Sequence, residues 1–265
     1  MDWTMESTKG PIISVIMPAY NSGRTIAQSI ASVRGQSFRD WELLVIDDCS
    51  WDDTLAIAKA EASGDARISV HRQAKNMGVS AARNAAMLLA RGEWLAFLDS
   101  DDTWQVDKLD RQLAFAQATG ATLTYTSTAY MDADGSAYGY VLRAEDVLTY
   151  GLLLRRNLLS CSSVMVRRAS MRPFPQGYMH EDYAVWLELL RDEPARGLDA
   201  PLLTYRLSNA SKSAGRLASA RMIFNSYRYV GYRPLCAIFL TILYSKHSIL
   251  KRLQVRMSKT TPKAS

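Results

Sequence analysis

Apolar runs alternate with amphipathic stretches through the first half of the chain. The apolar runs, which we expect to be strands, cover residues 12–17, 42–47, 68–71 and 94–98. The stretches between them have apolar positions at helical spacing, and we expect helices near 24–35, 53–62, 79–90 and 105–118. Strands that are apolar throughout are typical of sheets buried on both faces. The pattern predicts a mostly parallel α/β sheet flanked by helices.

The pattern changes after Ala121. We expect strands at 122–126, 162–166 and 202–206, a hairpin turn at residues 132–135 and a helix at 182–190. The last sixty residues indicate helices, and residues 235–244 among them are nearly all apolar. Ten apolar residues are too few to cross a bilayer, which takes about twenty.

Composition limits the class of protein. A chain of 265 residues with 48% hydrophobic and 22% charged residues is long enough for one large domain, or for a domain with an appendage. Its three cysteines are widely spaced, which predicts a reducing compartment and no disulfide framework. Three histidines argue against a zinc site built from histidine. The polar N-terminus lacks the apolar core of a signal peptide.

Charge is distributed unevenly. The net charge is +6, yet no Asp or Glu follows Asp199, whereas twelve Lys and Arg do. The first 199 residues have 20 basic and 26 acidic residues, a net charge of −6, and the remainder has +12. The excess predicts an anionic partner. An apolar stretch with basic flanks favours a helix lying in an anionic membrane surface, and we expect no nucleic acid. Packing on the protein itself or on a dimer partner stays open.

One acidic motif carries most of the functional information. Asp99, Ser100, Asp101 and Asp102 directly follow the apolar run 94–98. Ligands bind at the carboxyl ends of strands in open α/β sheets. Two carboxylates one residue apart can reach one Mg²⁺ or Mn²⁺, and such cations also take phosphate oxygens from a substrate. The motif therefore predicts a metal-bridged diphosphate, with an acidic turn that caps the next helix as the alternative.

Four further segments accompany this motif. They are Pro18-Ala19-Tyr20-Asn21 after the first strand, Asp47-Asp48-Cys49-Ser50 after the second, Asn76 to Asn84 opening a helix, and His180-Glu181-Asp182-Tyr183 far downstream. The loop after the first strand lacks the Gly-x-Gly-x-x-Gly pattern of dehydrogenase-type dinucleotide folds.

In this order and spacing the segments resemble the family 2 inverting glycosyltransferases of the GT-A fold, over roughly residues 12–207. Two departures are Cys49, where such enzymes often have Gly, and Val106, where Pro is common. The resemblance implies a Rossmann-like, mostly parallel sheet with a C-terminal helical appendage. We expect a polar tail at 1–11, a nucleotide-sugar-binding half at 12–120, an acceptor-side half at 121–210, the basic apolar appendage at 211–257 and a tail at 258–265.

The resemblance also implies roles for individual residues. The nucleotide site would comprise Pro18, Ala19, Tyr20, Asp48, Arg83 and Ser100. Asp99 and Asp101 would hold Mn²⁺ or Mg²⁺, and Asp102 would orient the loop or cap the following helix. Asp182 would be the general base, with Glu181 and Trp186 on the acceptor side. Simpler structural roles stay open: loop capping for Asp48, a surface ion pair for Arg83, a helix cap for Asp182 and core packing for Trp186.

We therefore expect a metal-dependent inverting glycosyltransferase that uses a UDP- or dTDP-sugar donor. The basic tail favours a lipid-linked glycan acceptor in surface polysaccharide biosynthesis, with the enzyme cytoplasmic and peripheral on the inner face of the cell membrane. One alternative is a nucleotide-sugar pyrophosphorylase, which would need a Gly-rich loop with Lys or Arg after the first strand. Another is a non-catalytic sugar-nucleotide-binding membrane subunit. The sequence leaves the oligomeric state open.

Overall fold

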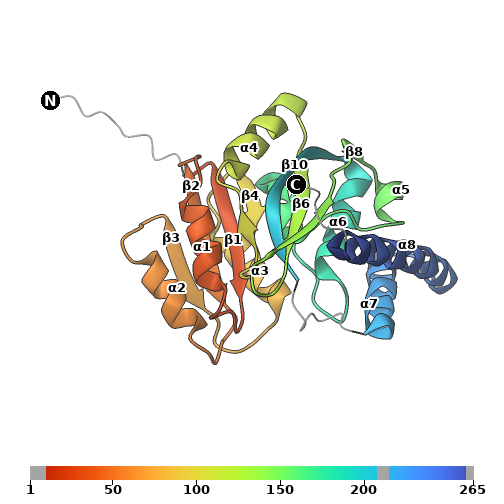
Figure 1. The fold of residues 1–265 in the computed structure, drawn as a ribbon, viewed down its shortest axis with the longest axis horizontal. Coiled ribbons are helices and arrows are strands. Elements are labelled where there is room, and N and C mark those ends of the chain that lie inside the picture. The colour runs from red at the N-terminus through yellow and green to blue at the C-terminus, as the bar shows by residue number, and fades with distance from the viewer. Residues whose placement is uncertain (1–9, 208–214, 261–265) are drawn as a thin grey trace.

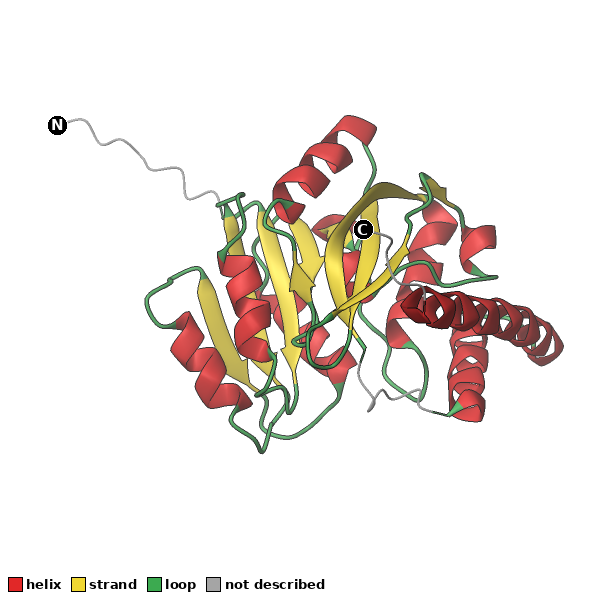
Figure 2. Ribbon diagram, viewed as in Figure 1, coloured by secondary structure: helices red, strands yellow, loops and turns green. Residues whose placement is uncertain are grey.

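The computed structural model describes residues 10–207 and 215–260, so parts of both predicted tails lie outside it. One sheet of ten strands crosses the molecule in the order β3-β2-β1-β4-β9-β6-β10-β5, with β7 paired to β6 and β8 to β10 (Figure 1). Figure 2 shows helices on both faces of this sheet and further helices gathered beyond its second half. The predicted fold class is confirmed.

The first half consists of alternating strands and helices. The elements are β1 (Ile13–Ala19), α1 (Ile26–Arg34), β2 (Trp41–Asp47), α2 (Thr54–Ala62), β3 (Ile68–Arg72), α3 (Val79–Leu89) and β4 (Trp94–Phe97). β1 pairs in parallel with β2 and β4, and β2 pairs in parallel with β3. Every predicted element of this half is confirmed, with ends that shift by three residues at most.

β1 shows why the two faces of the sheet need different helices. All seven of its residues are buried. Val15 and Met17 point into a core with Ile26 and Ile30 of α1, whereas Ile16 points into a second core with Ala82 of α3. Because successive strand side chains alternate between faces, a continuous apolar run requires a helical layer on each side.

The second half is a mixed sheet. Its elements are β5 (Thr103–Trp104), α4 (Lys108–Thr119), β6 (Leu123–Met131), β7 (Ala137–Leu142), β8 (Val147–Leu148), α5 (Tyr150–Leu153), β9 (Met165–Arg167), α6 (Glu181–Asp192) and β10 (Ala195–Arg206). β9 lies antiparallel between β4 and β6, while β6 and β10 are parallel. The sheet is therefore parallel from β3 to β4 and mixed beyond.

Two predictions for this half need correction. The strand expected at 162–166 shrinks to β9, because Cys161–Ser163 form a single 3₁₀ turn. The strand expected at 202–206 is the end of β10, which begins at Ala195. The hairpin turn at residues 132–135 is confirmed, since the amide of Gly135 donates to the carbonyl of Asp132 between β6 and β7. The short elements β5, β8 and α5 and the strand β7 were not predicted.

The C-terminal helices α7 (Arg216–Tyr229) and α8 (Pro234–Thr260) form the predicted helical appendage. Tyr183 of α6 links them to the sheet, because its hydroxyl lies 3.0 Å from that of Tyr227 in α7. Its ring also meets Tyr244 of α8 edge to face at 5.4 Å. Among the described residues, no helix combines the length and apolar character needed to cross a membrane.

Lys108, the first residue of α4, is an unexpected core residue. Its side chain is fully buried, and its ammonium nitrogen has no hydrogen-bond partner within the described residues. The nitrogen lies 3.9 Å from the ring centroid of Trp104. Burial lowers the pKa of Lys108 to about 7, because charging the amine would cost desolvation energy that no carboxylate offsets. The ring face of Trp104 opposes part of this effect.

The free energy of unfolding should therefore rise with pH between about 7 and 10.5. In this window the unfolded chain binds the proton of Lys108 and the folded protein does not, so each rise in pH favours folding. A Lys108→Met variant should be more stable than the native protein at pH 7, by an amount on the order of a few kcal/mol. This advantage should fade by pH 10. Urea unfolding of both proteins at the two pH values measures it, and an advantage independent of pH would contradict the idea.

Cys49 has a strained backbone after β2. Its φ angle is 60°, in the left-handed region where a side chain costs about 1–2 kcal/mol and glycine costs least. This is the position at which the resemblance expects Gly. The physical requirement for Gly is thus present, although the sequence has Cys.

Two substitutions should separate strain from side-chain contacts at this position. Cys49→Gly should leave the free energy of unfolding unchanged or raise it by up to about 1 kcal/mol, since relief of strain is partly offset by a freer unfolded chain. Cys49→Val should lower it by more than about 1 kcal/mol, because a β-branched residue fits this conformation worst. Urea unfolding would test both. A clearly destabilised Gly variant would show that the contact of Arg72 with the Cys49 sulfur, at 3.9 Å, outweighs the strain.

Candidate functional site

The carboxyl ends of three strands meet at one edge of the sheet. β1 lies between β2 and β4, so the segments after these strands adjoin one another. The strand order reverses direction at β1, and this is where open α/β sheets bind ligands. Pro18 and Ala19 are buried at the end of β1, whereas the next residue, Tyr20, is 47% exposed. Tyr20 is thus the residue of this segment with a free ring surface.

Side-chain hydrogen bonds join these loops. The side-chain oxygen of Asn21 accepts from the amide of Trp51, which ties the loop after β1 to the loop after β2. The hydroxyl of Ser22 lies 2.7 Å from that of Ser100, which ties the same loop to the acidic motif after β4. Thr25 also donates to the carbonyl of Ser100 at 2.9 Å. Ser100, predicted to contact the nucleotide, therefore holds two loops together.

Asp48 is engaged within the chain. Its Oδ1 accepts from the side chain of Gln73 and from the amide of Met77, and its Oδ2 accepts from the amide of Gly78, each at 2.8 Å. The residue is 3% exposed. Asp48 thus fixes the loop that leads into α3. This arrangement differs from the predicted contact with a base, which stays a prediction.

The acidic motif is held in place by residues from the second half of the chain. Asp102 is fully buried, accepts from the Ser162 hydroxyl at 2.6 Å and accepts from the amide of Arg206 at 2.9 Å. The guanidinium of Arg206 donates to the carbonyl of Asp101 at 3.0 Å. Asp102 therefore orients the loop, which was one of the two roles expected for it. It does not cap α4, because the N-cap residue of that helix is Asp107.

Asp101 lies among negative charges. Burial and the neighbouring carboxylate of Asp99 raise the pKa of Asp101 to about 6, although the charge of Arg206 opposes the shift. Within the described residues no cluster of three or more His, Cys, Asp or Glu side chains is arranged to hold a metal ion. A crowded pair of carboxylates nevertheless fits Mg²⁺ or Mn²⁺, because these cations use one or two protein carboxylates and fill their remaining positions with water and substrate phosphate.

Arg83 connects the acidic motif to α6. It extends from α3, and its side chain is 4% exposed. One guanidinium nitrogen lies 2.7 Å from Asp99, and the other lies 3.0 Å from Glu181 in the first turn of α6. The alternative of a surface ion pair is wrong for Arg83, because its guanidinium is buried although its partners are partly exposed. Two motifs that lie far apart in the sequence are thereby brought together.

Asp182 follows at the second position of α6. Burial and the charge of Glu181 raise the pKa of Asp182, while Arg83 and His180 oppose the shift. Its carboxylate accepts from the amide of Tyr183 at 2.8 Å. The helix begins at Glu181 with His180 as N-cap residue, so Asp182 is not the cap itself. A carboxylate with a raised pKa is a better proton acceptor than an ordinary one.

Trp186 does not belong to the site. It is fully buried, and its ring packs edge-on against Phe97 of β4 at 5.8 Å and against Phe174 at 5.9 Å. Trp186 lies about one helical turn beyond Asp182 in α6 and packs against the sheet through Phe97. The predicted acceptor contact is therefore wrong, and the alternative of core packing is confirmed.

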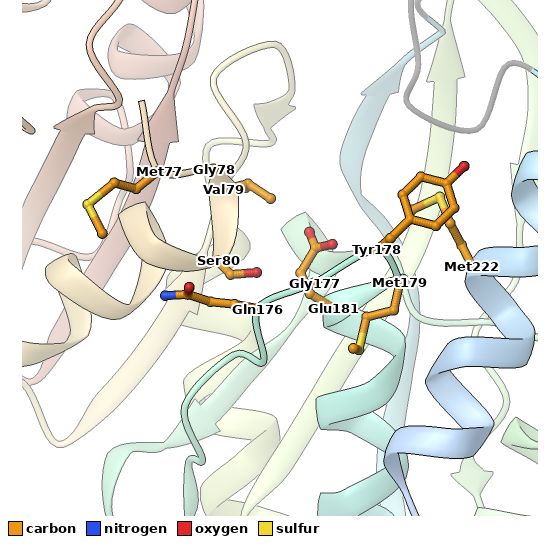
Figure 3. A pocket seen from close by; sticks show the side chains of 10 residues that line it. All are labelled: Met77, Gly78, Val79, Ser80, Gln176, Gly177, Tyr178, Met179, Glu181 and Met222. Carbon is orange, nitrogen blue, oxygen red and sulfur yellow. The ribbon is translucent and has the colours of Figure 1, made fainter. Parts of the chain in front are cut away.

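An open pocket of about 350 Å³ adjoins this cluster. Figure 3 shows residues 77–80, which span the start of α3, on one side with Gln176 beside Ser80, and Tyr178, Met179 and Met222 of α7 on the other. Glu181 lines the pocket too, so its carboxylate belongs both to the wall and to the Arg83 bridge. Apart from Glu181, Ser80 and Gln176, the lining is backbone, Met, Val and Tyr.

Sequence reasoning missed Ser162, Gln73 and Arg206. Arg206 counted only as part of the basic excess, yet it is 8% exposed and also donates to Gln28 and to the carbonyl of Ala133. Its place at the end of a predicted strand, like the acidic motifs, was a signal that could have identified it. Ser162 and Gln73 offered no comparable signal, because neither is charged and neither belongs to one of the motifs at the strand ends.

Comparisons with known proteins agree with this geometry. Residues 14–179 match the family model of glycosyl transferase family 2. TuaG of Bacillus subtilis (strain 168), a glycosyltransferase named for teichuronic acid biosynthesis, is 34% identical over 92% of this chain and 98% of its own length. WfgD of Escherichia coli, described as a UDP-Glc:alpha-D-GlcNAc-diphosphoundecaprenol beta-1,3-glucosyltransferase, is 32% identical over 88% of this chain and 92% of its own.

Solved structures share the fold at low sequence identity. S. aureus TarS 1-349 in complex with UDP-GlcNAc superposes with a TM-score of 0.70 at 20% identity, over 95% of this chain and 76% of that one. The mannosyltransferase PcManGT from Pyrobaculum calidifontis, in complex with GDP-Man and Mn2+, gives 0.66 at 17% identity, over 95% and 73%. With a family model that matches more than half of the chain and relatives aligned over nearly its whole length, the chain belongs to glycosyl transferase family 2.

Proposed function

We propose that this chain transfers a sugar from a UDP- or dTDP-linked donor to a hydroxyl group of a lipid-linked glycan, with inversion, in cell-surface polysaccharide biosynthesis. The observation that carries the proposal is the bridge by which Arg83 joins Asp99 to Glu181. This bridge holds the acidic motif and the first turn of α6 together beside an open pocket.

The relatives support the donor and acceptor classes. The description of WfgD names a UDP-linked glucose donor and a diphosphoundecaprenol-linked acceptor. WfaP of Escherichia coli has the same description and is 29% identical over 91% of this chain. The membership of the family disfavours a pyrophosphorylase.

The donor would bind across the ends of β1, β2 and β4. The exposed ring of Tyr20 is suited to stack on a nucleobase. Pro18 and Ala19 would shape the floor beneath the base, and Asp48 would hold residues 73–78 against it. Arg83 is placed to fix Asp99 and to offset negative charge when a diphosphate enters.

Asp99 and Asp101 are the residues that would hold Mn²⁺ or Mg²⁺, with Asp101 the more available because Asp99 is paired with Arg83. Such a cation supplies charge neutralisation at the leaving diphosphate. The structure of PcManGT, which shares this fold, is a complex with Mn2+, and this supports the choice of cation.

Asp182 would act as the general base. The acceptor hydroxyl oxygen forms a bond to the anomeric carbon as the bond from that carbon to the diphosphate oxygen breaks. The hydroxyl proton passes to the carboxylate of Asp182, and the nucleoside diphosphate leaves with the electron pair. Attack from the face opposite the leaving group inverts the anomeric carbon. The burial that raises the pKa of Asp182 favours its protonation in this step.

The metal assignment predicts the behaviour of Asp101→Asn. This variant keeps the size of the side chain but loses its charge, so Mn²⁺ affinity in the presence of UDP should fall by at least about tenfold. Titration calorimetry with Mn²⁺ and UDP measures this without turnover. The control is Asp107→Asn, a change at an exposed carboxylate on the same segment. Equal Mn²⁺ affinity in both variants, or full turnover in excess chelator, would contradict the assignment.

The base assignment predicts a different outcome for Asp182→Asn. Turnover should fall roughly 10²–10⁴-fold, because no proton acceptor remains, while UDP affinity should stay near native. Asp192→Asn, at the exposed other end of α6, should leave both quantities unchanged. Measured UDP release with a lipid-linked acceptor gives the rates. Near-native turnover of Asp182→Asn would remove Asp182 from the mechanism, and UDP binding without any turnover by the native chain would favour a non-catalytic subunit.

A further inference from the structure

α8 has an inner and an outer face. Ala237 is fully buried, and Tyr244 packs on Tyr183 of α6, so these residues mark the side that contacts the protein. Figure 1 shows α8 along the outside of the molecule, on the side away from β3 and α2. The opposite side of the helix has no covering element within the described residues.

The outer face is apolar. We call it the apolar stripe, and it consists of Leu235, Ile238, Phe239 and Ile242, which are 81%, 48%, 66% and 65% exposed. Their spacing of i, i+3, i+4 and i+7 places them along one side of a helix. Four large apolar side chains exposed together are unusual on a soluble protein and indicate a contact surface.

Basic residues flank the stripe. Arg233 precedes it and Lys246 follows it, and both are exposed. They stand about 20 Å apart along the helix axis. In the described part of the chain, no ion pair involves a basic residue that follows Arg196 in the sequence. The charges of Arg233 and Lys246 are therefore not paired within the protein. No acidic residue occurs after Asp199 to compensate them.

We propose that the apolar stripe is the surface by which this protein lies on an anionic lipid bilayer, with α8 parallel to the membrane plane. The apolar side chains would enter the acyl boundary while Arg233 and Lys246 meet lipid phosphates. This inference deepens the proposed function and rests on it, because contact with a membrane would bring the enzyme to an acceptor that is linked to lipid. It also gives the predicted membrane contact a particular face and orientation.

Charge selects the bilayer over the other occupants. A second copy of the chain seated on the stripe would bring two basic tails together without any acidic residue to pair with them. A nucleic acid would satisfy the charges but would leave the four apolar side chains uncovered. An anionic bilayer differs from both, because it offers an apolar layer beneath a negative surface.

The stripe is mechanically connected to the proposed base. Tyr244 on the inner face of α8 contacts the ring of Tyr183, which directly follows Asp182. The Tyr183 hydroxyl also donates to the carbonyl of Leu153 at 2.9 Å, so it has a fixed place in the core. A bilayer that holds α8 would therefore set the height of the catalytic end of α6 above the lipid surface.

Sedimentation with vesicles tests the proposal. The native chain at low salt should sediment with vesicles of phosphatidylcholine and phosphatidylglycerol, and much less with phosphatidylcholine alone. The double variant Phe239→Glu, Ile242→Glu should lower the partition coefficient at least about tenfold. Its reason is that two apolar side chains that would be buried in the lipid are replaced by charged ones. The matched control Leu88→Glu, Leu89→Glu adds the same charge to exposed leucines of α3 and should sediment like the native protein.

Three results would overturn the proposal. They are native protein that stays in solution with anionic vesicles, equal loss of sedimentation in both double variants, and a soluble native dimer that only the α8 variant dissociates. Light scattering reports the dimer, and UDP affinity of each variant reports that the sheet is intact. Sedimentation does not depend on turnover. Native protein that binds vesicles but transfers no sugar would therefore contradict the proposed function and still support the membrane-binding surface.

Discussion

The buried guanidinium of Arg83 is the contact on which the arrangement of the site depends. Removing such a group from water is costly, and it is stable here because Asp99 and Glu181 each face one of its terminal nitrogens. The two carboxylates come from opposite halves of the chain. By donating to both, Arg83 reduces their mutual repulsion and allows the acidic motif after β4 and the start of α6 to approach each other.

Negative charge is concentrated around this bridge. Asp101 and Asp182 both have raised pKa values, because burial and neighbouring carboxylates disfavour their ionised forms. Groups perturbed in this way are typical of functional sites. The same crowding favours cation binding at Asp101 and proton uptake at Asp182. The contact between Ser22 and Ser100, and the bond from the Asp99 amide to the Ser162 hydroxyl, keep the loops from moving apart under this repulsion.

The C-terminal helices are part of the catalytic domain's packing as well as an outward surface. Hydroxyl and ring contacts among Tyr183, Tyr227 and Tyr244 attach α7 and α8 to α6. Met222 of α7 also lines the pocket beside Glu181. The inner face of α7 thus contributes to the pocket wall and that of α8 packs on α6, while the outer face of α8 keeps apolar side chains exposed. The nearly uniform apolar run at residues 235–244 therefore supplies both a packed inner face and an exposed outer face of α8.

The sequence by itself determined the alternating strands and helices of the first half, the helical appendage and the family. Each of these follows from local periodicity or from motifs at strand ends, so neighbouring residues contain the information. The antiparallel β9 in the middle of the sheet, the pairing of Arg83 with Glu181 and the burial of Trp186 and Lys108 were decided by tertiary structure. Each depends on which distant segment fills the adjacent space, and periodicity does not specify that. Arg206 is the clearest case, because a residue that looked like surface charge became a buried support of the acidic motif once β10 paired beside β5.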